Sequence, residues 1–277
     1  MIPVAFEFQK ARSIDEAVAA ISGTDGKILA GGHSLIPALK LRLSHPTKLV
    51  DISGIPHLKG IQEKNGEIII GSACTHAEIS SHQLIREKLP FMARGASLIG
   101  DPQVRNYGTI GGSLAHADPA ADWPAMVLAA EADIEVQGPQ GKRKIKAKDF
   151  FTGFFSIALH EHELITAIHI PIPPPGTKTS YQKFIQPASR FAIVGCAVMR
   201  FPDGRTTIAF TGVSDHAFRD YPAEQFVSGK ELTPSAIHAA AEAAMVDIRI
   251  AGDSYASPVY RNHLAKVYLK KALQEVS

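Results

Sequence analysis

The sequence predicts a protein of two parts that mixes α-helices with β-strands. Helical patterns alternate with short apolar runs along the first part. The proline-rich segment Pro171–Gly176 then separates it from a region of longer strands and two alanine-rich helices. The chain has 277 residues, of which 45% are hydrophobic, which suits one large domain or two modest ones. We therefore expect a boundary near Pro173.

The elements of the first part are predicted from caps, apolar runs and turns. Ser13 and Glu16 have capping-box spacing and begin a short helix. Thr75 and Glu78 repeat that spacing, and helical patterning runs with interruptions from there to about residue 99. The other elements expected here are strands over residues 27–30, 49–52, 67–71 and 164–170, a helix over 34–41 capped by Ser34, and a hairpin of strands 134–137 and 143–147.

The second part has a different texture. Apolar and β-branched runs predict strands over residues 181–184, 192–201 and 206–211, with a turn at Pro202-Asp203-Gly204. Alanine-rich amphipathic patterns predict two closing helices over about 234–248 and 258–273.

Two glycine pairs about eighty residues apart are the most informative local feature. They stand in Ala30-Gly31-Gly32-His33-Ser34-Leu35 and in Thr109-Ile110-Gly111-Gly112-Ser113. A Gly-Gly step lets the backbone take φ > 0 and approach a ligand closely. Exposed N–H groups beside a hydroxyl suit a pyrophosphate. Two such loops in one domain suggest a large diphosphate ligand held from both sides, such as a flavin dinucleotide.

Neither glycine loop fits the common phosphate-binding motifs. A P-loop requires a lysine after the glycines, and a Rossmann fingerprint requires GxGxxG after a strand. Both are absent from these segments. We therefore expect a different fold to hold the anion.

Charge and cysteine content exclude several functions. The net charge of +2 gives no electrostatic case for binding nucleic acid. Cys74 and Cys196 form no CxxC, so an iron–sulfur or cysteine-ligated zinc site would have to lie on another chain. No run approaches the roughly 20 apolar residues of a membrane span. The first residues do not resemble a signal peptide, so we expect a cytoplasmic location.

The segment Ile99–Asp122 is dense in small and polar residues. It has little apolar periodicity, so we expect a long loop with a function. Asp122 is a candidate N-cap for the apolar helix that follows, with Pro124 in its first turn. His116, Asp118 and Asp122 could form a metal set, but no Glu or second His stands at ligand spacing. We expect no metal in this chain.

Four lysines alternate along the second strand of the predicted hairpin. They are Lys142, Lys144, Lys146 and Lys148. This pattern favours an edge strand protected against pairing with other chains. A docking stripe for a partner is the alternative.

These segments together resemble the FAD-binding medium subunit of the molybdenum hydroxylases, especially that of the carbon monoxide dehydrogenase type. The chain is similar in kind to the flavin domain of xanthine dehydrogenase. The resemblance covers essentially the whole chain and is carried by Ala30–Leu35 with Lys40-Leu41-Arg42, by Gly71–Glu78, by Ile99–Asp122 and by Gln186–Val194.

The resemblance implies an α+β fold. A two-part FAD-binding domain of the vanillyl-alcohol-oxidase/PCMH type would span residues 1–173, with subdomains of about 1–57 and 58–173. A smaller C-terminal α+β flavoprotein domain would span residues 177–277.

The resemblance also implies which residues meet FAD. The two glycine segments would surround the pyrophosphate and the ribityl chain, and Asp122 would hydrogen-bond on the ribityl or adenosine side. Lys183 and Phe191 would lie near the isoalloxazine ring and act on its chemistry. The cofactor-binding residues so implied are Ala30, Gly31, Gly32, His33, Ser34, Leu35, Thr109, Ile110, Gly111, Gly112, Ser113, Ala117, Asp122, Lys183 and Phe191.

The function implied by the resemblance is electron transfer in a heterotrimer. A large subunit would carry molybdopterin, and a small subunit would pass electrons through two [2Fe–2S] clusters to FAD on this chain. Two such heterotrimers would form a dimer. A self-sufficient FAD-dependent oxidase of the same broad fold is one alternative, although such enzymes usually carry a larger substrate domain. A scaffold subunit without flavin is another, against which the intact glycine loops argue. The substrate and the final electron acceptor are not readable from these motifs.

Overall fold

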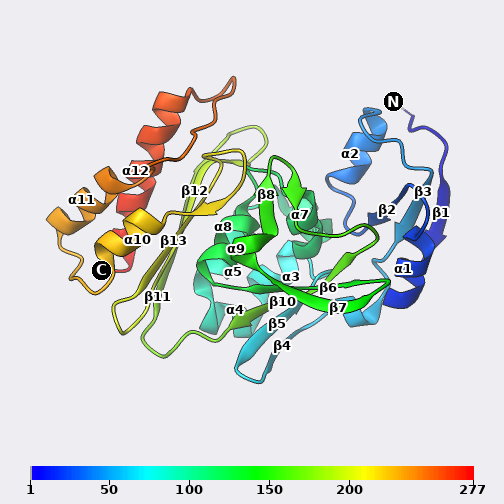
Figure 1. Ribbon diagram of the computed structural model, residues 1–277, viewed down its shortest axis with the longest axis horizontal. Helices are drawn as coiled ribbons and strands as arrows, with labels where there is room; N and C mark the ends of the chain where they lie inside the picture. The colour runs from blue at the N-terminus through cyan, green and yellow to red at the C-terminus, as the bar shows by residue number, and fades with distance from the viewer. Residues whose placement is uncertain (1) are drawn as a thin grey trace.

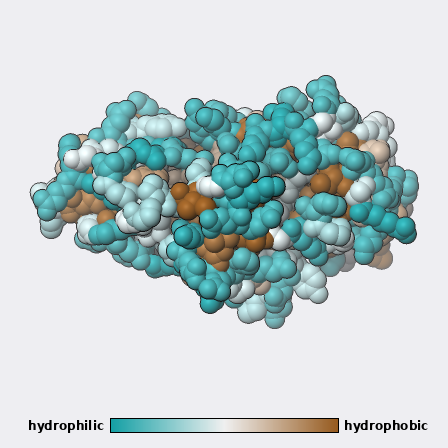
Figure 2. Space-filling model, turned by 90° about the horizontal axis from the view of Figure 1, so that it is seen from below, coloured by the Kyte–Doolittle hydropathy of each residue, from teal (hydrophilic) through white to brown (hydrophobic). Residues whose placement is uncertain are grey.

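Three main β-sheets follow one another along the long axis of the molecule (Figure 1). The computed structural model describes residues 2–277. The N-terminal sheet lies at one end, and the helices of the C-terminal part lie at the other. One face of the molecule is largely hydrophilic, with small hydrophobic patches near its middle (Figure 2). The mixture of helices with parallel and antiparallel sheets confirms the expected α+β class.

The first sheet is small and parallel. Its strand order is β1 (Glu7–Lys10), β3 (Lys48–Asp51) and β2 (Gly26–Leu29). Helix α1 (Ile14–Ile21) connects β1 to β2, and α2 (Leu35–Lys40) connects β2 to β3. Strand β1 was not expected, because most of its side chains are exposed and it carries little apolar signal.

The second sheet is antiparallel and forms the centre of the molecule. Its strand order is β4 (Ile61–Lys64), β5 (Glu67–Gly71), β10 (Leu164–Pro171), β6 (Asp133–Gly138) and β7 (Gly141–Lys146). The expected hairpin and the expected strand before the proline-rich segment are both confirmed.

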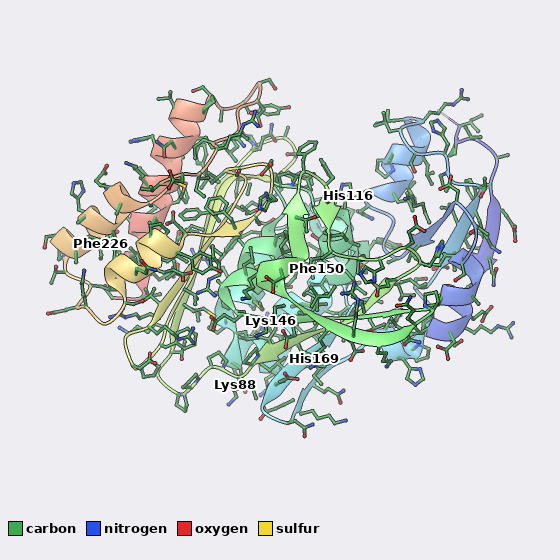
Figure 3. The ribbon with its side chains drawn as sticks, viewed as in Figure 1. Lys88, His116, Lys146, Phe150, His169 and Phe226 are labelled. Carbon is green, nitrogen blue, oxygen red and sulfur yellow. The ribbon has the colours of Figure 1, made fainter. Side chains whose placement is uncertain are left out.

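Strand β7 is an edge strand, as the lysine pattern predicts. Lys142, Lys144 and Lys146 lie on it, with Lys146 labelled in Figure 3. Lys148 lies beyond the strand, in the short helix α9 (Ala147–Phe150).

The helical stretch expected up to residue 99 consists of three short helices. They are α3 (His76–Ser81), α4 (Gln83–Lys88) and α5 (Pro90–Ser97). The capping box at the start of α3 is confirmed. The cap of α1 differs from the prediction, because the carboxylate of Glu16 accepts from the backbone N–H of Arg12 instead of that of Ser13.

The prediction of a long loop over residues 99–122 is wrong. This segment contains α6 (Pro102–Tyr107), capped by Asp101, and α7 (Ile110–His116), capped by Thr109. Both helices are short, and most of their side chains are small or polar. Their apolar periodicity is therefore too weak to show in the sequence.

The C-terminal part is a four-stranded antiparallel sheet covered by helices. The strands are β11 (Lys178–Ile185), β12 (Ala192–Arg200), β13 (Thr206–Thr211) and β14 (Phe218–Arg219), and the helices are α10 (Tyr221–Val227), α11 (Pro234–Ala243) and α12 (Pro258–Glu275). The three expected strands and two expected helices are confirmed, although α11 ends five residues before the predicted limit. Helix α10 was not predicted. The short elements η1 (Pro56–Leu58), β8 (Phe151–Gly153) and β9 (Ser156–Ile157) complete the fold.

One hydrophobic core extends across the proline-rich segment. Helix α8 (Asp122–Ala129) is buried along its whole length. Its Trp123 belongs to the same core cluster as Tyr181 of β11 and Met199 of β12. One face of the C-terminal sheet therefore packs on helices of the first part, and the other face packs on its own helices.

Candidate functional site

A cavity of about 610 Å³ lies between the first sheet, the beginning of α7 and the start of the C-terminal part. This volume is in the range of small-molecule and cofactor sites. The expected residues found on its wall are Ala30, Gly31, Gly32, His33, Ser34, Leu35, Thr109, Gly111, Gly112, Ser113, Asp122 and Phe191. The cavity thus brings residues of both glycine segments together with Asp122 and Phe191.

Three of the expected residues do not line this cavity. Ile110 and Ala117 are buried in the main core, at the two ends of α7. Lys183 is fully buried at its side chain and is not on the wall. Ile110, Ala117 and Lys183 were in the expected FAD-binding set, but the structure does not place them on the wall of this cavity.

The first glycine segment leaves its backbone donors free. Gly32 has φ +73°, the left-handed conformation that the Gly-Gly step was expected to allow. Gly31 approaches so closely to the carbonyl of Tyr107 that a Cβ would collide with it. Within residues 2–277, the N–H groups of Gly32, His33 and Ser34 donate no hydrogen bond to protein atoms. These donors are available to a ligand.

Ser34 does not cap α2 as predicted. Its backbone is helical, with φ −106° and ψ −47°, and its hydroxyl makes no capping hydrogen bond. An N-cap residue normally has an extended backbone, which turns its side chain back over the first turn of the helix. The exposed hydroxyl of Ser34 instead forms part of the cavity wall.

The second glycine segment is built differently from the first. Its glycines lie in the first turn of α7, and neither has positive φ. The N–H of Gly112 donates to Oγ1 of Thr109 at 3.1 Å, and the N–H of Gly111 donates to the carbonyl of Ser72 at 2.9 Å. These donors are used within the protein, so the second glycine segment does not present free N–H groups as the first one does.

Asp122 is not the N-cap of α8. Ala121 holds that position, and Asp122 is the first helical residue. Its carboxylate accepts from the hydroxyl of Tyr181 at 2.5 Å and from Nζ of Lys183 at 2.8 Å. Burial raises the pKa of Asp122, while the charge of Lys183 opposes this shift. Lys183 lies on β11, which is an edge strand, but its side chain is fully buried.

The loop between β11 and β12 supplies the far side of the cavity. Arg190 has φ +62°, and its N–H donates to the carbonyl of Gln186 at 2.8 Å. The side-chain oxygen of Gln186 accepts from the N–H of Ser189, which tightens the turn further. This turn presents Arg190 and Phe191 to the cavity, and Phe191 remains 42% exposed.

Aromatic contacts border the cavity on the side of α7. His116, labelled in Figure 3, is the last residue of α7 and lines the cavity. Its ring lies 5.0 Å from that of Phe155, between centroids. On the first segment, the rings of His33 and Tyr107 stack at 5.7 Å.

Ser72 and His76 are buried polar residues of the wall that are absent from the expected FAD-binding set. Both are buried, at 3% and 5% exposure. Oγ of Ser72 has no hydrogen-bond partner among the described residues. Nδ1 of His76 accepts from the indole N–H of Trp123 at 3.0 Å. The available signal was the pair of polar side chains that follows a buried strand at Gly71.

The wall of the cavity fits FAD. The free N–H groups of the first glycine segment can hold phosphate oxygens. A buried hydroxyl without a partner, such as that of Ser72, is unusual in a folded protein and can be satisfied by a ligand oxygen. Of the residues described, no group of three or more His, Cys, Asp or Glu side chains could hold a metal ion. None of the helices seen in residues 2–277 is long and apolar enough to cross a membrane.

Comparison with known families assigns both parts of the chain. Residues 4–173 match the family described as FAD binding domain in molybdopterin dehydrogenase. Residues 179–276 match the CO dehydrogenase flavoprotein C-terminal domain.

Full-length relatives agree with this assignment. The chain is 39% identical to the carbon monoxide dehydrogenase medium chain of Hydrogenophaga pseudoflava, over 99% of this chain and 97% of the relative. It is 27% identical to the xanthine dehydrogenase FAD-binding subunit of Escherichia coli O157:H7, over 97% of this chain and 94% of the relative.

Solved structures show the same fold. A chain of carbon monoxide dehydrogenase from Hydrogenophaga pseudoflava matches with a TM-score of 0.96 and 40% identity, covering 100% of this chain and 98% of that one. A chain of quinoline 2-oxidoreductase from Pseudomonas putida 86 matches with a TM-score of 0.93 and 28% identity, covering 100% and 98%. The chain therefore belongs to the FAD-binding medium subunits of the molybdenum hydroxylases, of the carbon monoxide dehydrogenase type, and is an oxidoreductase subunit with FAD as its cofactor.

Proposed function

We propose that this chain transfers electrons from a partner subunit to FAD within a heterotrimer. A small subunit would carry [2Fe–2S] clusters, a large subunit would carry molybdopterin, and two heterotrimers would form a dimer in the cytoplasm. The full-length match to a carbon monoxide dehydrogenase medium chain supports this role. Cys74 and Cys196 are both buried and belong to different core clusters, so a cluster site would lie on another chain.

The observation that carries the proposal is the cavity with free backbone donors on one wall. We propose that the N–H groups of Gly32, His33 and Ser34 bind the pyrophosphate, because they lack protein partners. The second glycine segment would then line the ribityl chain through Gly112 and Ser113, which are not fully buried. Phe191 would lie against the isoalloxazine ring.

The proposed domain division follows the expected one. The FAD-binding domain would span residues 1–173, with subdomains of about 1–57 and 58–173, and the C-terminal flavoprotein domain would span 177–277. The proline-rich segment between β10 and β11 supports this division along the sequence. The main hydrophobic core, however, contains residues from both sides of the segment.

Lys183 is proposed to act on the flavin through Asp122. It is buried behind Asp122, which lines the cavity. An unpaired cation 4 Å from a reduced flavin would favour the reduced form by roughly 4 kcal/mol at a dielectric constant near 20. We expect a smaller effect because Asp122 offsets the charge.

A redox titration tests the role of Lys183. Lys183→Met should lower the midpoint potential while the FAD content of the folded protein stays near that of the wild type. An unchanged midpoint would remove the proposed role. Loss of FAD would show that Lys183 anchors the cofactor instead.

Isolation from the native cell tests the proposed function. The chain is tagged in its own genome, recovered from extract and analysed for native mass, iron, molybdenum and acid-released flavin. We expect one FAD per chain, released by acid, in a complex that contains both metals. Recovery only as a monomer without either metal would reject the proposal. Reduction of the flavin in the isolated chain by a small organic substrate would favour the self-sufficient oxidase.

A further inference from the structure

We propose that the uncharged side chains of Ser72 and His76 each hydrogen-bond to oxygen atoms of FAD. Trp123 would fix the tautomer of His76 in which Nε2 is the donor. Neither residue is in the expected FAD-binding set. The inference rests on the assignment of FAD as the cofactor of this chain. It gives a role to the segment Gly71–Glu78, which the sequence singled out without assigning one.

Ser72 has a fixed backbone and a spare hydroxyl. Its N–H donates to the carbonyl of Thr166 at 3.0 Å, and its carbonyl accepts from the N–H of Gly111 at 2.9 Å. These bonds hold Ser72 between β10 and the first turn of α7. Its Oγ is buried at the cavity wall and has no partner within the described part of the chain. A ligand oxygen or a ligand donor would satisfy it.

His76 is held in a single tautomer. The indole of Trp123 is a donor only, so Nδ1 of His76 must be the acceptor in their 3.0 Å bond. The proton of the neutral ring therefore lies on Nε2. No described residue hydrogen-bonds this nitrogen. A Cβ on the neighbouring Gly108 would come within 2.7 Å of it, so the glycine leaves it uncovered.

His76 also stays neutral. Burial lowers its pKa to about 3, and the nearby charges of His33 and Arg105 act in the same direction. The ring therefore donates a hydrogen bond at neutral pH without carrying a charge. This donor suits an oxygen acceptor at any pH in which the protein would work.

Few cationic side chains line the cavity wall. Lys27 and Arg190 are the only lysine or arginine side chains on the wall as far as residues 2–277 are described. Of the carboxylates on the wall, Asp122 is paired with Lys183 and Glu163 with Arg143, while Asp118 forms no ion pair with a described residue. A pyrophosphate therefore meets only a small excess of positive charge here, and we expect uncharged N–H and O–H groups to hold many of its oxygens.

The first variant to test is Ser72→Ala in the full chain. Removing an unpaired buried hydroxyl should leave the melting temperature of the FAD-free protein unchanged or raise it. FAD added to this protein should bind about 3- to 10-fold more weakly than to the wild type, as measured by quenching of flavin fluorescence. A purely structural serine would show the opposite pattern.

Ser180→Ala is the matched control. Ser180 is equally buried, at 1% exposure, but its hydroxyl donates to Glu275 and it lies off the cavity. This substitution should lower the melting temperature and leave the affinity for FAD unchanged.

A double-mutant cycle tests the role of Trp123. His76→Phe should weaken FAD binding about 3- to 10-fold, because the Nε2 donor is lost. Trp123→Phe should also weaken it, although Trp123 does not line the cavity. The double variant should bind FAD no more weakly than His76→Phe alone, because the indole acts only through the imidazole.

The outcomes separate this inference from the assignment on which it rests. If the wild type binds FAD and Ser72→Ala and His76→Phe both bind it within twofold of the wild-type affinity, the inference is wrong and the FAD assignment stands. Additive losses in the cycle would overturn the role of Trp123. If the FAD-free wild type takes up no FAD, the assignment itself fails.

Discussion

At the residue scale, the most informative pair is Asp122 and Lys183. The two residues are 61 positions apart, and each was predicted to have a separate role. The structure joins them in a 2.8 Å ion pair with side chains 4% and 0% exposed. A buried pair of this kind contributes little net stability when intact, but losing one partner is costly because a charge is then left buried alone.

Lys183→Met should therefore lower the free energy of unfolding by about 3–5 kcal/mol at neutral pH. The loss should shrink as the pH falls, because Asp122, whose pKa is raised by burial, then takes up a proton. Adding Asp122→Asn should restore most of the stability. Urea unfolding at several pH values measures all three proteins. Equal stability of wild type and Lys183→Met at neutral pH would contradict the buried charge pair.

The lowered pKa of His76 predicts a pH dependence of stability. Its folded pKa is about 3 and its ordinary value is 6.5, so below pH 6.5 only the unfolded chain binds this proton. The contribution of neutral His76 to the free energy of unfolding is complete above pH 6.5. It is lost as the pH falls toward 3. Between pH 7.5 and 5 the loss is about 2 kcal/mol. Between pH 7.5 and 5, the free energy of unfolding of His76→Gln, measured with urea, should fall by about 2 kcal/mol less than that of the wild type. Equal decreases in the two proteins would contradict the prediction.

At the element scale, the start of α7 explains why two adjacent glycines are needed. A Cβ on Gly111 would lie 2.5 Å from Cβ of Ser72 and 2.8 Å from its carbonyl oxygen. A Cβ on Gly112 would approach only Oγ1 of Thr109, at 2.8 Å. Gly111 therefore allows α7 to pack against Ser72, the residue that follows β5. Gly112 leaves room for the capping hydroxyl of Thr109.

Gly111→Ala should destabilise the protein by about 1–3 kcal/mol through overpacking. Gly112→Ala should be close to neutral, because a weakened cap of about 1 kcal/mol is offset by the better helix propensity of alanine. Chemical denaturation of the FAD-free variants compares the two. A larger loss for Gly112→Ala would contradict this reading of the turn.

Elements with a strong local signal could be predicted from the sequence. The capping box at Thr75, the β6–β7 hairpin and the lysine edge follow from neighbouring residues alone. Helices α6 and α7 could not be predicted, because they are stabilised by caps and contacts more than by apolar periodicity. The first glycine segment was found for the same local reason. His76 was missed because its role depends on Trp123, 47 residues further along the chain.

At the scale of the whole molecule, the proline-rich segment is a boundary in sequence but not in packing. The hydroxyl of Thr211 lies within hydrogen-bond distance of the carbonyls of Pro119 and Ala121, at 2.7 and 2.6 Å, and donates its one proton to either. The N–H of Ala192 donates to the carbonyl of Ala120 at 3.1 Å. Together with the shared core, these bonds connect the C-terminal sheet to the segment that leads into Asp122.

Cutting the chain within Pro173–Gly176 should not separate its two parts. A protease site placed there should be cleaved completely, as a denaturing gel would show. Both fragments should still elute together from a gel-filtration column without denaturant. The shared core provides the reason, since dissociation would expose Trp123 and Tyr181 to water. Two separate peaks at the masses of the fragments would contradict it.

The complete burial of α8 also has a consequence for how the protein is made. A nascent chain that has emerged only as far as the proline-rich segment lacks the strands that cover one side of this helix. Its apolar surface stays open to solvent until β12, β13 and β14, the last of which ends at Arg219, have left the ribosome. During that interval we expect the half-made protein to be a substrate for chaperones. Because Arg190 and Phe191 belong to the later-emerging part, the cavity would be complete for the cofactor only after that part has been made.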